Sequence, residues 1–259
     1  MEKDIIKSFE PQDDLNPKIW YLPKEKYMGD PEGQEYKMKP EVRERLLNIA
    51  YEFIDFVGVD MVISDIVLTG SLSNYTWSKY SDFDLHVIIN FLQFPENQRE
   101  LYKELFNLKK ILFNQKYDIK IFGYEVELYL EDEAESHFSS GVYSLLFDLW
   151  EIEPEKQNVT IDKKTIENKA KQWMRIIDGV LDNIQDEDIE TAKELIEKYK
   201  EKLRRFRTCG LEKGGDYSSE NLVFKILRRN GYLEKLRTAK EKLVQKKLSI
   251  DEKRKLHTV

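Results

Sequence analysis

Residues 68–87 read LTGSLSNYTWSKYSDFDLHV, and this stretch decides the fold. Its start continues an apolar run that predicts a short strand over 65–69, ending at Gly70 and Ser71. A second strand is predicted over 82–90, because apolar and polar residues alternate there with a period of two. One face of this strand carries Phe83, Leu85, Val87 and Ile89, and the other carries Asp82, Asp84 and His86.

The acidic pair on the second strand predicts a cation site. Asp82 and Asp84 are two positions apart, so their side chains point the same way and their charges repel unless a cation lies between them. Carboxylate oxygens are hard ligands that suit Mg²⁺ or Mn²⁺. The alternative is an exposed edge strand whose acidic side chains simply face water.

The Gly70-Ser71 pair favours the cation site over that alternative. Glycine lets a backbone approach a phosphate closely, and we expect a helix to begin just after it, where free N–H groups attract anions. The Ser71 hydroxyl is a further candidate donor to the same phosphate. The ten-residue interval from Ser71 to Asp82 suits a short helix and a return into the adjacent strand.

These residues resemble the motif of the nucleotidyltransferase superfamily of the polymerase-beta type, an apolar strand followed by Gly-Ser and then Asp-x-Asp. The chain looks most like nucleotidyltransferase-fold proteins of phages and bacteria, and the likeness extends to VELYLED (126–132), SSGVYS (139–144) and ENLVFKILRRNGYLEKL (220–236). The resemblance implies an α+β fold: a polymerase-beta-like domain with a mixed sheet, followed by an all-α C-terminal domain.

The resemblance also implies a third carboxylate on a neighbouring strand. The run 124–130 offers Glu127, which apolar residues flank, and Glu125 on the same face remains an alternative. With Asp82 and Asp84, the third carboxylate would hold two Mg²⁺ or Mn²⁺ ions that bridge a nucleoside triphosphate and an attacking hydroxyl. These three carboxylates are therefore the predicted catalytic and metal-binding residues.

Three parts are predicted along the chain. Five of the seven prolines lie within residues 1–40, which predicts an extended N-terminal arm. Residues 41–160 hold the motif and form the predicted catalytic domain, with helices over 41–57 and 95–115 and a hairpin near 142–152. Residues 161–259 are predicted to be helical, over 163–183, 187–206, 219–229 and 232–247, with a break at 210–216.

Further substrate contacts are predicted outside the motif. Tyr143 could stack on a base and Ser144 lies beside it, although an ordinary hairpin entry explains this segment equally well. Lys225 and Arg229 share one side of a predicted helix and suit a triphosphate or an RNA backbone. An ordinary solvated helix face is the alternative for both.

Composition limits the kind of protein. The net charge is −7, yet residues 161–259 hold 25 Lys+Arg against 18 Asp+Glu, a local +7 able to face a polyphosphate. The single cysteine, Cys209, excludes an internal disulfide framework and favours the cytoplasm. The sequence has no apolar run of about 18 residues, so no membrane span is predicted.

The predicted function is a metal-dependent, ATP-binding or otherwise nucleotide-binding transferase. It would move a nucleoside monophosphate from a nucleoside triphosphate to a hydroxyl on RNA, a nucleotide or another molecule, with release of pyrophosphate. A signalling-oligonucleotide synthase is one form of this prediction. The competing hypothesis is a catalytically silent nucleotide-binding or antitoxin-like module.

Overall fold

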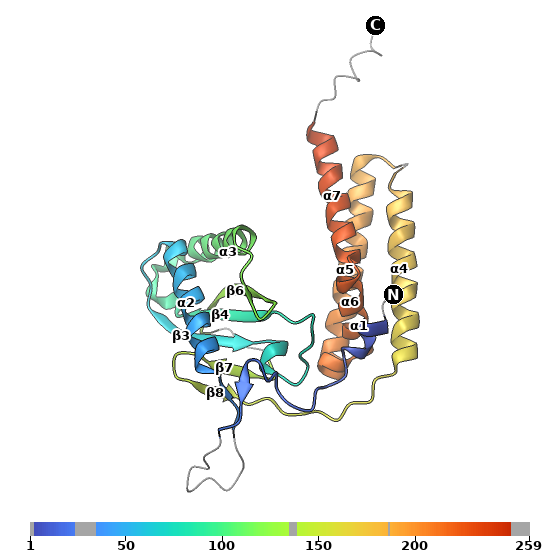
Figure 1. Ribbon diagram of the computed structural model, residues 1–259. Helices are drawn as coiled ribbons and strands as arrows, with labels where there is room; N and C mark the ends of the chain where they lie inside the picture. Colours follow the sequence, from blue (N-terminus) through green and yellow to red (C-terminus); the bar gives the residue numbers. More distant parts are fainter. Residues whose placement is uncertain (1–2, 24–34, 135–138, 186, 250–259) are drawn as a thin grey trace. The chain divides into compact units, whose positions relative to one another are not determined.

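A computed structural model describes residues 3–23, 35–134, 139–185 and 187–249 (Figure 1). The chain divides into two compact units. One consists of Pro11–Asn158, here called the sheet unit. The other consists of Met1–Glu10 together with Val159–Val259, here called the helical unit.

The sheet unit is built on a six-stranded mixed sheet in the order β5-β6-β4-β3-β7-β8. β4 and β6 run parallel, whereas the other neighbouring pairs are antiparallel. The strands are β3 (Ile63–Thr69), β4 (Phe83–Ile89), β5 (Lys120–Ile121), β6 (Tyr124–Asp132), β7 (Val142–Ser144) and β8 (Leu149–Ile152). The predicted α+β class and mixed sheet are confirmed.

Two amphipathic helices, α2 (Pro40–Val57) and α3 (Arg99–Lys116), pack against each other and against the sheet (Figure 1). Their buried residues include Leu46, Phe53 and Phe113, which share one core cluster with Leu85 of β4. Because side chains alternate across a strand, Asp84 and His86 of β4 face away from this core. The α2–α3 core therefore leaves the opposite face of the sheet for polar chemistry.

The N-terminal segment is less extended than its prolines predict. Lys3–Lys7 form a short helix, α1, while β1 (Trp20–Tyr21) and β2 (Lys37–Met38) pair as a small antiparallel ribbon. Trp20 is buried, and its ring stacks on Trp150 of β8 at 4.5 Å between centroids. Burial of large apolar side chains from this segment accounts for the added order.

Four long helices form most of the helical unit: α4 (Lys163–Asn183), α5 (Ile189–Gly214), α6 (Ser219–Arg229) and α7 (Tyr232–Leu248). α1 joins them by packing against α6. In the described part of the chain, no helix combines the length and apolar character needed to cross a membrane.

The predicted break at 210–216 is wrong for its first five residues, because α5 continues to Gly214 and a 3-10 turn follows at Gly215–Tyr217. Gly210 is buried, and a Cβ added to it would lie 2.5 Å from the Cβ of Glu220 on α6. The glycine thus permits a close helix–helix approach and does not end the helix.

Candidate functional site

Three carboxylates converge on the sheet face opposite the α2–α3 core. Asp82 precedes β4, Asp84 lies within it, and Glu127 of β6 is the direct partner of Asp84 in the parallel register. One oxygen from each of the three lies within 4.8 Å of the others, and all three side chains are half-buried. Glu125, the alternative, is exposed and lies 3.6 Å from the ammonium of Lys120.

Gly70 makes room for this cluster. It follows β3 with φ of 77° and ψ of −159°, a backbone conformation that side chains disfavour. A Cβ at this position would lie 1.9 Å from Oδ2 of Asp84. The glycine is therefore needed for the close approach of a carboxylate, in addition to any approach of a phosphate.

Ser71 starts a three-residue 3-10 helix, Ser71–Ser73, where a short helix was predicted. Its hydroxyl donates to Oγ of Ser81 at 2.7 Å, and Ser81 also accepts from the backbone N–H of Ser78 at 2.9 Å. Ser81 immediately precedes Asp82. The two serines thus tie the Gly70 turn to the start of the acidic strand.

Tyr129 is a member of the site that the sequence did not reveal to us. It lies two positions after Glu127, on the same face of β6, and its hydroxyl donates to Oε2 of Glu127 at 2.7 Å. Burial, the hydrogen bond to Glu127 and the charges of Glu127, Asp84 and Asp82 all raise the pKa of Tyr129 well above its usual range. The hydroxyl therefore stays protonated and holds one oxygen of Glu127 in place. Its position two residues after Glu127, on the same face of a strand, is the sequence signal that could have identified Tyr129.

His86 and Tyr129 form a stacked pair next to the carboxylates, with ring centroids 4.6 Å apart and planes 15° apart. The imidazole lies between two polar groups, since Nε2 is 3.1 Å from Oγ1 of Thr69 and Nδ1 is 3.0 Å from a carboxylate oxygen of Glu131. These contacts fix the ring. His86 therefore supports Tyr129 and, through it, Glu127.

The donor set fits a divalent cation of the hard class. All three groups are carboxylates, which is the ligand type that Mg²⁺ and Mn²⁺ prefer. Their mutual distances are short enough for one ion to contact all three, and their partial burial weakens screening by water.

Comparison with known families agrees with this geometry. A model of the nucleotidyltransferase domain matches residues 48–180, just over half of the chain. The chain belongs to the nucleotidyltransferase domain family. No curated protein matches it. The match to this nucleotidyltransferase domain begins within α2 and includes the whole carboxylate cluster, and it ends in α4.

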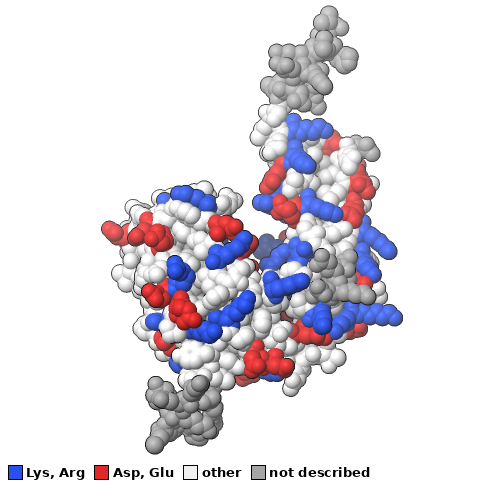
Figure 2. All heavy atoms as spheres, viewed as in Figure 1, with Lys and Arg blue, Asp and Glu red and all other residues white. Residues whose placement is uncertain are grey.

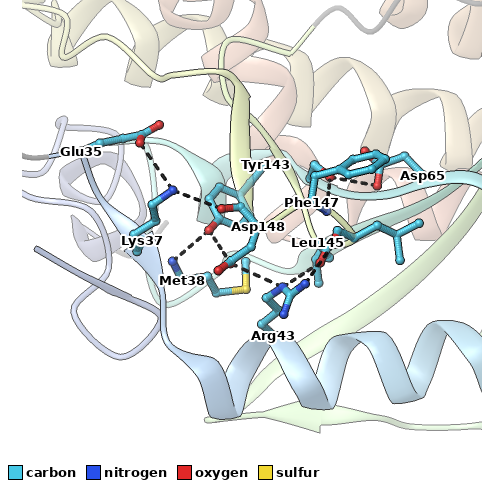
Figure 3. A network of polar contacts seen from close by, with 11 residues as sticks. Glu35, Lys37, Met38, Arg43, Asp65, Tyr143, Leu145, Phe147 and Asp148 are labelled. Carbon is cyan, nitrogen blue, oxygen red and sulfur yellow. Dashed lines mark hydrogen bonds and ion pairs between the residues drawn. The ribbon is translucent and has the colours of Figure 1, made fainter. Parts of the chain in front are cut away.

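The structure contradicts the predicted substrate contacts at Tyr143 and Ser144 of this nucleotidyltransferase. Tyr143 is fully buried, edge-on to both Trp20 and Trp150 at 4.9 Å between centroids, and its hydroxyl donates to Asp148 at 2.8 Å. Figure 3 shows this tyrosine within a polar network that also includes Arg43. Because its side chain is 0% exposed, Tyr143 offers no accessible ring face to a base.

Ser144 is also fully buried, and its hydroxyl donates to Oδ1 of Asp65 at 2.9 Å. Oγ of Ser144 in turn accepts from the backbone N–H of Phe147 at 3.1 Å. Its hydrogen-bonding capacity is thus used inside the sheet unit. The hairpin interpretation, which the sequence left equally open, explains both residues.

The small residues before this hairpin support the Gly70 turn. Oγ of Ser73 donates to the carbonyls of Gly70 and Gly141, both at 2.9 Å. A Cβ on Gly141 would lie 2.1 Å from the carbonyl oxygen of Ser73. Gly141 is therefore required for backbone packing behind the turn.

Lys225 and Arg229 belong to the helical unit and not to the unit that holds the carboxylates. Arg229 donates to Oγ of Ser8 at 2.8 Å, and its guanidinium lies 4.8 Å from the centre of the Phe9 ring. Arg229 is half-buried against the segment that follows α1, so its side chain does not lie on a fully solvated helix face. Lys225 is half-buried too, and burial lowers the pKa of its ammonium.

Proposed function

We propose that this nucleotidyltransferase transfers a nucleoside monophosphate from a nucleoside triphosphate to a hydroxyl acceptor and releases pyrophosphate, in the cytoplasm. One observation carries the proposal: Asp82, Asp84 and Glu127 converge within 4.8 Å in a chain that belongs to the family. A cluster of three half-buried carboxylates is costly to keep ionised unless it holds a cation.

The roles of the residues follow from their positions. Asp82, Asp84 and Glu127 would hold Mg²⁺ or Mn²⁺, which supplies neutralisation of triphosphate charge and activation of the acceptor hydroxyl. Tyr129 holds Glu127 through its 2.7 Å hydrogen bond. Gly70 leaves the space beside Asp84 open, and the backbone of Gly70 and Ser71 would face the phosphates.

The proposed acceptors are RNA, another nucleotide or a different hydroxyl compound. A signalling-oligonucleotide synthase is included, since its product would form by the same transfer. A silent nucleotide-binding or antitoxin-like module is less well supported, because all three carboxylates, Gly70 and the Tyr129 hydrogen bond are in place.

The experiment is transfer from each of the four labelled ribonucleoside triphosphates, with Mg²⁺ or Mn²⁺ and with or without total RNA. Labelled RNA supports an RNA-directed transferase, and a small labelled product without RNA supports a signalling synthase. Glu127→Gln should lower the rate at least about 100-fold, which is the scale of losing one transition-state charge contact. Triphosphate binding without any product in every condition would favour the silent module.

Glu125→Gln is the matched control. It removes the same charge from the same strand, two residues away, at an exposed side chain outside the cluster. The rate of this variant should stay within about two-fold of the wild type, as for most surface substitutions. Equal losses in the two variants would show that the position of Glu127 has no special part in the reaction.

A further inference from the structure

The helical unit contains a groove that the proposed reaction does not use. It lies where α5 meets α6 and α7 and has a volume of about 580 Å³. Arg204, Arg207 and Thr208 line it from α5, Phe224 from α6 and Leu233 from α7. Sites for small organic ligands have volumes of about 300–1,000 Å³, so the groove is of the size for one such molecule.

The acidic residues of the groove are already paired. Glu197 lies 2.8 Å from the ammonium of Lys240 and 3.3 Å from that of Lys200, and Glu201 lies 3.0 Å from Nε of Arg205. Within the described parts of the chain, no carboxylate is at ion-pair distance from Arg204 or Arg207. The positive charge of these two arginines is thus available to a ligand.

The contacts of Arg207 also leave its positive charge without a neutralising carboxylate. Its Nε donates to the side chain of Asn221 at 3.2 Å, and its guanidinium lies 4.8 Å from the centre of the Phe224 ring. Burial and then the charge of Arg228 lower its pKa, against a smaller opposing effect of Asp216. On the face seen in Figure 2, the helical unit carries both basic and acidic side chains. Among the described residues, Arg207 therefore has no carboxylate at ion-pair distance, and an anionic ligand in the groove would supply a partner.

The apolar part of the lining consists of Leu203, Leu211, Phe224, Leu233 and Leu236. A ligand that satisfies both parts needs a flat apolar body and an attached anion. Arginine forks match phosphate oxygens, and apolar or aromatic side chains pack on nucleobases. Both features belong to a nucleotide.

We propose that this groove binds a mononucleotide, with its phosphate on Arg204 and Arg207 and its base on Leu211, Phe224 and Leu233. A single unit fits better than a strand, because the cations lie within one turn of α5 and do not follow an extended track. This site needs no metal, so it is additional to the triphosphate site of the proposed reaction.

The test is isothermal titration calorimetry of the full chain with AMP, GMP, CMP and UMP in excess EDTA. Chelation removes the cation that the carboxylate site requires, so any remaining nucleotide binding is independent of the proposed transfer. At least one nucleotide should bind, and Arg204→Glu should weaken it about ten-fold or more, a change of about 1.4 kcal/mol. Thr208→Trp, at an exposed position that lines the groove, should weaken it to a similar degree by filling the space.

Lys202→Glu is the matched control, since it makes the same charge change two residues away, at an exposed side chain that does not line the groove. It should leave the affinity within about two-fold. Equal weakening by Arg204→Glu and Lys202→Glu would reduce the effect to general surface charge and overturn the proposal. So would the absence of binding by all four nucleotides in a folded wild-type protein.

Two further probes test the nature of the ligand. Inorganic phosphate should compete at least about ten-fold less well than the nucleotide, because it leaves the apolar lining unused. Equal competition by phosphate would overturn the role of the base. A single-stranded RNA that binds more tightly than every mononucleotide, and is weakened by Thr208→Trp, would overturn the proposed occupant. A failed transfer assay leaves these binding results unchanged, so the two proposals fail separately.

Discussion

At the scale of single residues, Gly70 carries the strictest requirement of the site. In Gly70→Ala, the alanine would have to adopt a φ of 77°. Its Cβ would also lie only 1.9 Å from Oδ2 of Asp84, so the carboxylate must move. We expect the affinity for Mn²⁺ to fall at least about ten-fold, which corresponds to about 1.4 kcal/mol. Calorimetric titration with Mn²⁺ measures this change.

Gly123→Ala is the control for backbone strain. Gly123 has a φ of 88°, but a Cβ there meets nothing within 4 Å. The strain of the left-handed conformation, about 1–2 kcal/mol, should lower the stability of both variants. If Gly123→Ala weakened Mn²⁺ binding as much as Gly70→Ala, the contact with Asp84 would not be the cause.

Tyr129 offers a second prediction at this scale. Tyr129→Phe removes the hydrogen bond that holds Glu127, and loss of such an outer-sphere partner typically costs about ten-fold or more in metal affinity. Tyr143→Phe is the matched control, because it removes an equivalent hydrogen bond to Asp148, remote from the carboxylate cluster. Electron paramagnetic resonance of free Mn²⁺ should show weaker binding by the first variant alone, and equal binding by both would contradict the role of Tyr129.

The sequence predicted the two aspartates of the carboxylate cluster, but it did not decide which glutamate is the third carboxylate. It left Glu125 open beside Glu127, since both lie on one face of the same strand. The choice depends on the parallel register that pairs Asp84 with Glu127, and this register is set by long-range packing. Tyr129 escaped prediction for the same reason, because a tyrosine in a strand is ordinary until its partner is known.

At the scale of elements, the hairpin of β7 and β8 has a structural role that a substitution can test. Ser144→Ala removes the hydroxyl that donates to the buried carboxylate of Asp65, which should cost about 1–3 kcal/mol. Urea unfolding measures this loss, while KM for the triphosphate should not change. A raised KM with unchanged stability would restore Ser144 as a substrate contact.

Ser64→Ala, a substitution on β3, is the control for the stability loss expected of Ser144→Ala. Its hydroxyl donates to Glu133 at 2.5 Å, but this bond is exposed. Surface substitutions of this kind change stability by about 0.5 kcal/mol or less.

Element boundaries were predictable where local pattern controls them. α2 begins at Pro40 and ends before Gly58, whose φ is 69°, as the proline and glycine preferences of helix ends require. The break was predicted at Gly210 because glycine often ends a helix. Glycine also allows two helices to pack closely, and Gly210 does so between α5 and α6. Single-sequence reasoning does not separate these two uses, because only the partner helix distinguishes them.

At the scale of the whole molecule, cation binding should couple to stability. A ligand that binds only the folded chain stabilises it by about 2.7 kcal/mol at 100 times its Kd. Mn²⁺ should therefore raise the Tm of the wild type, and removal by EDTA should reverse the shift. In Asp82→Asn, which loses one charge of the cluster, the shift should largely vanish. An unchanged Mn²⁺ shift in this variant, measured by calorimetry, would place the cation elsewhere.

The helical unit should depend on α1 and the residues after it. Ile5, Ile6 and Phe9 are buried, and Phe9 also packs under the guanidinium of Arg229. Phe9→Ala should cost about 3–5 kcal/mol, the usual range for a buried phenylalanine. Hydrogen exchange should show faster exchange in α6 and unchanged protection in β4, since only α6 belongs to the same unit. Faster exchange in both would mean that the two units unfold together.

This arrangement has a consequence for how the protein is made in the cell. Ser8 cannot form its hydrogen bond until the ribosome has added its partner, Arg229, which comes 221 positions later. At about 5–20 residues per second, that delay lasts from about ten seconds to most of a minute. Pro11–Asn158 is complete well before α6 exists, so the sheet unit can fold while Ile5, Ile6 and Phe9 still expose their side chains. The helical unit can therefore complete its core only after synthesis has passed α6.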